Sequence, residues 1–329
     1  MPKEITHVAF ADFTSEQIKN TETYKHIFNS KNSFHFGSLA VDSFYYNMKL
    51  PIIDKDFFQW GDLVHGAEGN NPFIAIYAAL KYLKENKNDS LFSEKLAFIC
   101  GYLTHCAMDV NFHPYVYYFS GNYYDPDKEE SINAQMRHRI IESWIDLYII
   151  KNKGKYNTKS AAKVFNTDNL NIELLKFIST HFAATWQTNE QKVFIAIKRG
   201  YFVQKVLNNL FDNKHIKDYV KSLNQITKNK IRSYLALFYP DNFDIPDYII
   251  NFGTYKNPVT GEEFNSSFED LWSNALNLST DFLNAVDQYL FDDNDLILQE
   301  TIKGYSLDVG LIEVPVKEVK YFSTWNISP

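Results

Sequence analysis

Apolar residues recur at helical spacing along almost the whole chain, and this periodicity is the feature that most limits the fold. Segments such as NNPFIAIYAALKYLKEN and SEKLAFICGYLTHCAMDV place apolar side chains three and four residues apart, which is the period of an amphipathic helix. Ser, Asn and Pro at the starts of such segments are typical helix-start signals. The sequence therefore predicts an all-α protein, a multi-helix bundle.

The order of these segments predicts one large domain with an extension. A Pro-, Gly- and Asn-rich stretch at about 240–265 separates most of the helices from a long one that begins near residue 267. We expect a helical domain over residues 1–235 and a C-terminal helical extension over residues 236–329. In the tail, GLIEVPVKEVKYFSTW alternates as a short pair of strands would.

Charge and hydropathy exclude some classes of partner. The net charge is −7 and we see no Lys/Arg cluster that offsets it, so no stable nucleic-acid partner is expected. No run of eighteen apolar residues predicts a transmembrane helix. The start, MPKEITHVAFADF, lacks the apolar core of a signal peptide. We therefore expect a cytoplasmic protein, or a secreted one if a leader has been removed; the oligomeric state is not indicated.

One stretch departs from a plain apolar helix. GYLTHCAMDVNFHPYVYYFSG, residues 101–121, places His105, Asp109 and His113 at successive four-residue intervals before Pro114. Four residues are about one helical turn, so His105 and Asp109 project from the same face. We expect this helix to break at Pro114, because proline lacks the backbone N–H that a helix interior needs.

A second His-x-x-x-acid pair, His138 and Glu142, lies on the next helical segment. Nine histidines and 40 acids in 329 residues give about one such pair by chance, so two pairs alone are weak evidence. The pairs are either hydrogen-bonded groups within a helical core or ligands of a metal. A buried ionised carboxylate is costly unless it is paired or metal-bound, and His, Asp and Glu suit zinc.

The complete order of these residues resembles the zinc-dependent phospholipase C family, whose fold is shared with single-strand nucleases. The resemblance lies in H-x-x-x-D-x-x-x-H-P followed by H-x-x-x-E, preceded by an early His, an Asp and another His. This chain has the three upstream residues as His7 in THVAFA, Asp42 in GSLAVDSFYY and His65 in WGDLVHG. The resemblance covers about residues 5–150.

The resemblance implies Zn²⁺ as the cofactor, as two or three ions held by buried histidines and carboxylates. The implied ligands are Asp42, His65, His105 and Asp109 for one zinc, His113, His138 and Glu142 for a second, and His7 with the bridging Asp109 for a third. In secreted members an N-terminal Trp completes the third site, and this chain has no Trp near its start. Asp146, one turn beyond Glu142, is either a supporting residue for the ligands or a solvated helix residue, and we expect the latter.

The implied activity is phospholipase C-like hydrolysis of a phosphodiester by a metal-activated water, with Asp42 as the catalytic base. Choline-selective members have aromatic residues at the positions of Ser43 and Asp62. A quaternary ammonium binds to aromatic faces, so we expect a phosphodiester substrate, a phospholipid included, other than phosphatidylcholine. Two alternatives stay open: a nuclease on the same fold, and a non-catalytic helical protein that binds zinc only for structure.

Overall fold

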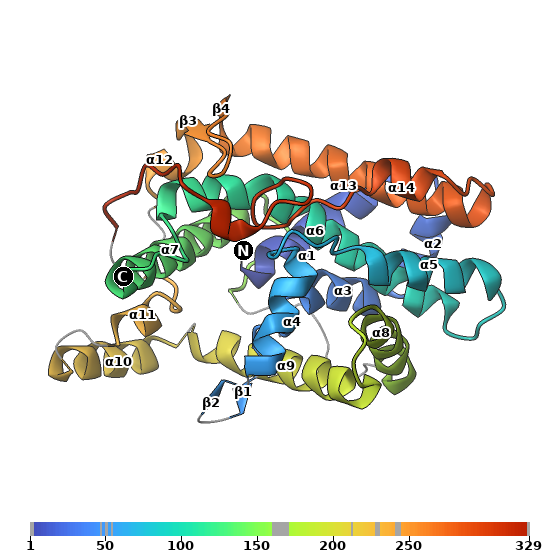
Figure 1. Ribbon diagram of the computed structural model, residues 1–329, viewed down its shortest axis with the longest axis horizontal. Helices are drawn as coiled ribbons and strands as arrows, with labels where there is room; N and C mark the ends of the chain where they lie inside the picture. Colours follow the sequence, from blue (N-terminus) through green and yellow to red (C-terminus); the bar gives the residue numbers. More distant parts are fainter. Residues whose placement is uncertain are drawn as a thin grey trace.

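Helices make up nearly all of the regular structure, as the sequence predicts (Figure 1). The computed structural model describes residues 3–46, 48–49, 52–53, 55–159, 171–211, 213–227, 231–240 and 245–327. The all-α fold class is confirmed. Among the described helices, none combines the length and the apolar run needed to span a membrane.

The first half of the chain contains seven of the described helices and one small hairpin, in the order α1 (Glu4–Gln17), α2 (Glu22–Asn29), α3 (Lys31–Ser43), β1 (Met48–Lys49), β2 (Ile52–Ile53), α4 (Lys55–His65), α5 (Ile74–Glu85), α6 (Phe92–Ser120) and α7 (Lys128–Asn152). The described part of the second half consists of α8 (Ile172–Thr185), α9 (Glu190–Phe211), α10 (Lys214–Ile226), α11 (Arg232–Leu235), α12 (Asp247–Ile250), β3 (Gly253–Lys256), β4 (Glu263–Ser266), α13 (Phe268–Phe291), α14 (Ile297–Thr301) and a 3₁₀ turn at Val316–Glu318.

Side-chain caps explain where several of these helices begin. Asp127 accepts hydrogen bonds from the backbone N–H groups of Glu129 and Glu130 at the start of α7. Ser267 and Asp270 form a capping box at the start of α13. Such caps satisfy backbone donors that have no partner within the helix.

Helix α6 forms the centre of the bundle (Figure 1). Its buried residues lie on every side of the helix, as expected of a helix with no solvent-facing surface. The expected break at Pro114 is wrong, since the helix continues to Ser120. Packing on all sides holds the helical course, so the missing N–H of Pro114 removes one hydrogen bond without ending the helix.

Helices α3 and α6 pack backbone against backbone. A Cβ atom at Gly37 would lie 2.0 Å from the carbonyl oxygen of Phe98, and one at Gly101 would lie 1.9 Å from that of Phe34. Each glycine therefore removes the side chain that would separate the two helices. The contact brings the last turn of α3 beside the middle of α6.

Helix α13 packs along α6, although it belongs to the expected extension (Figure 1). Phe282, Leu283 and Val286 are fully buried in the same apolar cluster as Leu96 and Leu103 of α6. The division of the chain after residue 235 stays a prediction. The described part of the C-terminal segment shares the main core.

The expected strand pair in the tail is wrong for the described residues 310–327, which contain only isolated bridges and the 3₁₀ turn. The tail's N–H groups bond one at a time to distant carbonyls: that of Val316 to Ala67, that of Ser323 to Tyr118 and that of Trp325 to Phe119. An alternating pattern fits such an extended segment as well as it fits a strand. The second hairpin is β3–β4, inside the stretch expected to be a loop.

Replacing Gly101 with Ala should destabilise the protein by about 3 kcal/mol, because the added methyl group forces α3 and α6 apart. Thermal and denaturant unfolding measure the change. Gly154→Ala is the matched control, because a Cβ there meets no atom within 4 Å and only its left-handed backbone costs about 1 kcal/mol. Equal losses in the two variants would contradict the importance of the helix contact.

Candidate metal centre

Four helices and the end of a fifth bring the eight expected ligands together. His7 lies on α1, Asp42 on the last turn of α3 and His65 at the end of α4. The remaining side chains, three from α6 and two from α7, are His105, Asp109, His113, His138 and Glu142. All eight are buried.

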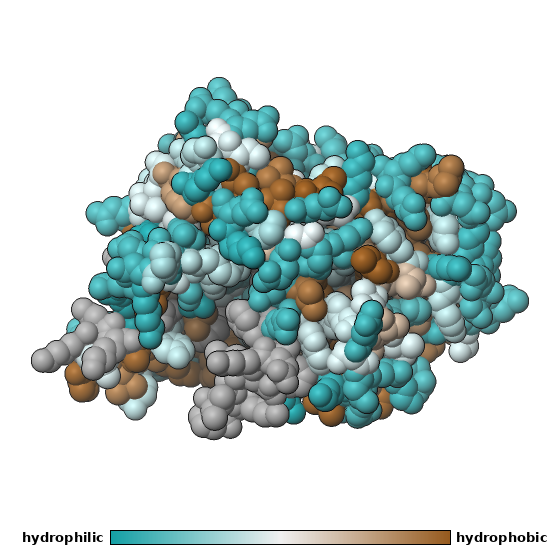
Figure 2. Space-filling view, in the orientation of Figure 1, coloured by the Kyte–Doolittle hydropathy of each residue, from teal (hydrophilic) through white to brown (hydrophobic). Residues whose placement is uncertain are grey.

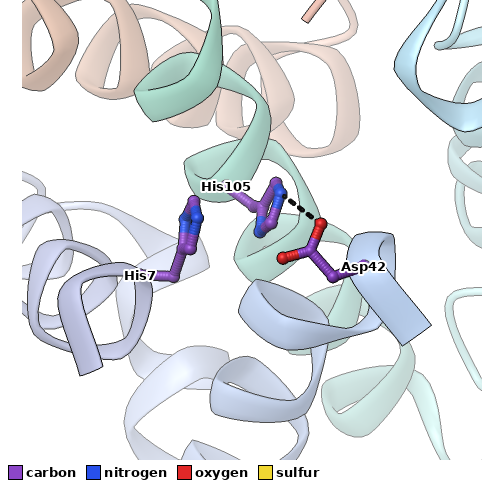
Figure 3. Close-up of side chains that lie close together, drawn as sticks. All are labelled: His7, Asp42 and His105. Carbon is purple, nitrogen blue, oxygen red and sulfur yellow. Dashed lines mark ion pairs between the residues drawn. The ribbon is translucent and has the colours of Figure 1, made fainter. Parts of the chain in front are cut away.

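The potential ligand atoms form three groups, and within each group the atoms lie no more than 4.8 Å apart. The groups are His7 with Asp42 and His105, His65 with His105 and Asp109, and His113 with His138 and Glu142. Figure 3 shows the first group, with the side chains from α1 and α3 directed toward His105. The rings of His7 and His105 stack at 3.8 Å. The structure therefore brings all eight residues together, while their assignment as ligands stays a prediction.

Asp109 lies at the centre of these groups. Its Oδ2 atom is 2.9 Å from Nε2 of His105 and 3.9 Å from Nε2 of His65. Its Oδ1 atom is 3.6 Å from Nε2 of His7 and 3.7 Å from Nε2 of His113. One carboxylate thus faces four imidazoles, as a bridging ligand would.

Two histidines have a ring orientation set by main-chain carbonyls. Nδ1 of His65 donates to the carbonyl of Gly61 at 2.8 Å, and Nδ1 of His105 donates to that of Ser38 at 2.8 Å. Each bond leaves Nε2 directed at Oδ1 of Asp42. The distance from this oxygen is 3.4 Å to Nε2 of His65 and 3.6 Å to Nε2 of His105, and Figure 3 shows the second pair. Such support fixes the imidazole orientation in metal sites.

Burial and charge set the protonation of the metal-free centre. Burial lowers the pKa of His7 and that of His138 well below the usual value, so both rings are neutral. Burial also opposes charge on His65, but Asp42 and the other carboxylates outweigh it and raise the pKa to about 9. Burial favours neutral Asp109, yet the surrounding histidines hold its pKa well below the usual value.

The donor set fits a cation. Buried atoms without a hydrogen-bond partner among the described residues gather here: both nitrogens of His7, both oxygens of Asp109, Nε2 of His105 and both nitrogens of His113. Burying polar groups unpaired is costly. Tetrahedral zinc separates its N and O ligands by roughly 3.3–3.6 Å, close to the distances from Asp42 Oδ1 to the two nearest Nε2 atoms.

The grouping differs in one respect from the expected one. His7 lies with Asp42 and His105 as well as beside Asp109, so it is shared between the expected first and third sites. In secreted members the third site is completed by the N-terminal Trp, and residues 1 and 2 of this chain lie outside the described residues. The other four histidines, His26, His35, His181 and His215, belong to none of the three groups.

Asp146 supports α1 next to His7. It accepts hydrogen bonds from the backbone N–H of Thr6 at 2.9 Å and from the Tyr239 hydroxyl at 2.7 Å. Burial raises the pKa of Asp146, and these hydrogen bonds offset part of the increase, so the pKa is about 6. The carboxylate therefore joins α7 to the start of α1, and the expectation of a solvated residue is wrong, since Asp146 is fully buried.

Two acidic residues near the site were missed from the sequence. Glu4 is buried one turn before His7, and its side chain accepts from Tyr46 and Gln204 at 3.4 and 3.3 Å. The spacing Glu4-x-x-His7 was the available signal. Asp308, in the C-terminal segment, has an oxygen 3.5 Å from Nδ1 of His113, and no local pattern marks it.

The two positions expected to contact the head group differ in their surroundings. Ser43 is fully buried and donates to Gln204 at 3.2 Å, away from an exposed surface. Asp62 is half-buried and accepts from the Tyr45 hydroxyl at 3.2 Å. Burial raises the pKa of Asp62 to about 6. Of the two, Asp62 is the better placed to meet a substrate.

A family model described as zinc dependent phospholipase C matches residues 6–189. This match spans more than half of the chain and contains all eight residues of the three groups. The chain belongs to the zinc-dependent phospholipase C family. No curated protein and no solved structure matches it.

Removal of zinc should lower the free energy of unfolding, because the ligands come from α1, α3, α4, α6 and α7 and metal binding contributes to folding. The loss is about 4 kcal/mol if free zinc was present at a thousand times its Kd. Elemental analysis and thermal unfolding before and after chelation measure it. His105→Gln should lose zinc and the exposed His215→Gln should not; an unchanged transition after full metal removal would contradict this.

Proposed function

We propose that the protein is a phospholipase C-like phosphodiester hydrolase that uses zinc and a water nucleophile. Membership of the family supports this proposal, and so do the three buried groups of potential ligands. The observation that carries it is the slight exposure of the side of the centre formed by Asp42, His138 and Glu142. The side chains of Asp42, His138 and Glu142 are 7%, 8% and 9% exposed, whereas those of His105 and Asp109 are fully buried.

This gradient favours catalysis over a purely structural role. The group of His113, His138 and Glu142 offers three ligands, and catalytic zinc sites have three protein ligands and one open position. A structural site is closed by four protein ligands. Two members of the group, His138 and Glu142, are the most exposed of the eight at 8% and 9%, so we expect a substrate oxygen to approach from that side.

When bound, zinc supplies positive charge for the phosphate oxygens and acidifies a bound water. Asp42 takes a proton from the attacking water, whose oxygen forms a bond to phosphorus. The bond from phosphorus to the leaving alcohol breaks, and the proton returns to the alcohol oxygen. His65 and His105 would hold the zinc beside Asp42, whose Oδ1 atom lies 3.4 and 3.6 Å from their Nε2 atoms.

Aromatic side chains surround the exposed edge and would contact the substrate. The Tyr45 ring lies 4.9 Å from that of His65, and the rings of Tyr117 and Tyr123 lie 5.1 and 5.6 Å from that of His138. Burial raises the pKa of Tyr45 and that of Tyr117 well above the usual value, so both remain hydroxyl donors. Their hydroxyl groups suit acceptor oxygens of the substrate, whereas the Asp62 carboxylate favours a head group with hydroxyl or amine donors.

Asp42→Asn should retain its neighbours and most of the zinc but lose activity by about 10²–10⁴-fold, as expected for removal of a general base. The assay is a panel of lipid, nucleotide and aryl phosphodiesters with zinc present. Zinc content, measured in parallel, separates loss of the base from loss of the metal.

Asp62→Asn is the comparison variant for the same panel, and it should change the preference among head groups while zinc content stays constant. Hydrolysis of nucleotide substrates alone would favour the nuclease. If the wild-type protein and Asp42→Asn hydrolyse every member equally slowly, the hydrolase is excluded and zinc serves the structure only.

A further inference from the structure

The C-terminal segment brings a carboxylate to the metal centre from well beyond the matched residues 6–189. Asp308 is 5% exposed, and its Oδ1 atom lies 3.5 Å from Nδ1 of His113. Its other oxygen is buried without a hydrogen-bond partner among the described residues. A buried carboxylate in this place requires a cationic or hydrogen-bonding neighbour.

The turn that holds Asp308 is tied to the centre on both sides. The backbone N–H of Leu307 donates to the carbonyl of His65 at 2.8 Å. A Cβ atom at Gly310 would lie 2.8 Å from the carbonyl oxygen of Val110. That carbonyl has no helical donor four residues on, because Pro114 lacks an N–H, so the turn packs where α6 leaves room for it.

Nδ1 of His113 completes a pattern set by two other histidines. Nδ1 of His65 and that of His105 each face an acceptor, and the Nε2 atoms face the central carboxylates. In His113, Nε2 lies 3.7 Å from Asp109 and Nδ1 faces Asp308. We propose that Asp308 is a positioning residue that accepts the Nδ1–H of His113 and keeps Nε2 available for zinc.

This proposal rests on the proposed zinc-dependent function, and the test uses metal binding without turnover. Asp308→Asn should weaken binding at the His113 site by about 10–100-fold, as for other carboxylates that support a zinc-bound histidine. Titration of the metal-free full chain with zinc measures affinity. Replacement with Co²⁺ adds an absorption spectrum that changes at the same site. The melting temperature of the metal-free variant should remain close to that of the wild type.

Asp281→Asn, an exposed acid on α13, is the matched control and should bind zinc normally. Equal affinities in the wild type and Asp308→Asn would overturn the positioning role while leaving the hydrolase proposal intact. Loss of one whole zinc equivalent would also overturn it, because Asp308 would then be a ligand. If the wild type binds no zinc, both proposals fail.

An independent observation concerns the surface of α9 and α10. Residues 190–226, which include both helices, contain seven Lys and Arg residues and three acidic residues, a net +4 in a chain whose total is −7. The remainder therefore carries −11. The expectation of no Lys/Arg cluster is wrong for this basic segment, which the acidic total of the chain does not reveal.

The same helices expose large apolar side chains. Ile195, Phe202, Val206 and Leu210 of α9 are 37%, 64%, 40% and 37% exposed, and their spacing places them on one face. Exposed Lys192 and Lys198 lie beside this face. On α10, Tyr219 and Ile226 are 64% and 77% exposed. Figure 2 shows apolar side chains at the lower left, where α10 lies in Figure 1.

An exposed apolar stripe flanked by basic residues is the surface that lies in the interface of an anionic membrane. Nucleic acid would satisfy the charge but would leave the aliphatic side chains of Ile195, Val206 and Leu210 without a matching partner. We infer that α9 and α10 dock the protein on an anionic lipid bilayer. The partner of this face is the surface of the bilayer rather than a single soluble head group.

Sedimentation with phosphatidylglycerol vesicles tests the docking surface, with phosphatidylcholine vesicles for comparison. The protein should bind the anionic vesicles, and Phe202→Ser with Ile226→Ser should weaken binding by about tenfold or more. Lys192→Glu with Lys198→Glu should also weaken it at low salt, and the difference from the wild type should shrink as salt rises, because salt screens the charges. Phe28→Ser, at a position 70% exposed on α2, is the control and should bind normally.

Three outcomes would overturn the docking proposal. One is no binding to anionic vesicles at low salt, and another is binding that the α9 and α10 variants leave unchanged. The third is a different occupant: a dimer detected by light scattering that the same variants abolish, or single-stranded DNA that displaces the vesicles. Soluble glycerol phosphate should not compete.

Discussion

The close contact between α3 and α6 is the constraint on which the rest of the structure depends. Gly37 and Gly101 allow the two backbones to meet without intervening side chains. Asp42 follows the first glycine on α3 and His105 follows the second on α6, so the crossing sets the distance between these two groups. The centre is therefore built on rigid helices, which hold a site more accurately than loops do.

The buried charge of Asp109 is the main electrostatic consequence of this packing. Asp109 is fully buried and faces four imidazoles, so its charge must be balanced inside the protein. Without metal, the balance comes from protons, and the pKa of His65 is raised to about 9 despite its burial. Zinc would replace those protons, which makes its affinity fall as the pH falls. Metal binding would therefore stabilise the same arrangement of helices as packing does.

Helical spacing was enough to pair His105 with Asp109 and His138 with Glu142, since residues four apart share a face whatever the fold. His7, Asp42 and His65 come from separate helices, and only the order typical of the family indicated them. Asp308 could not be found, because its place depends on a turn far along the chain. The local proline rule also failed on α6, where packing on all sides outweighs one missing hydrogen bond.

Helix α9 connects the two halves of the proposed function. On its inner face a Cβ at Gly200 would lie 1.8 Å from the carbonyl of Ser43, the residue after Asp42. On its outer face lies the exposed Phe202. A helix with its side chains is about 10 Å thick, so docking through the outer face would hold Asp42 about one helix diameter from the lipid surface. Phospholipid phosphates lie at that surface, so docking would hold the centre close to the phosphates of its proposed substrate.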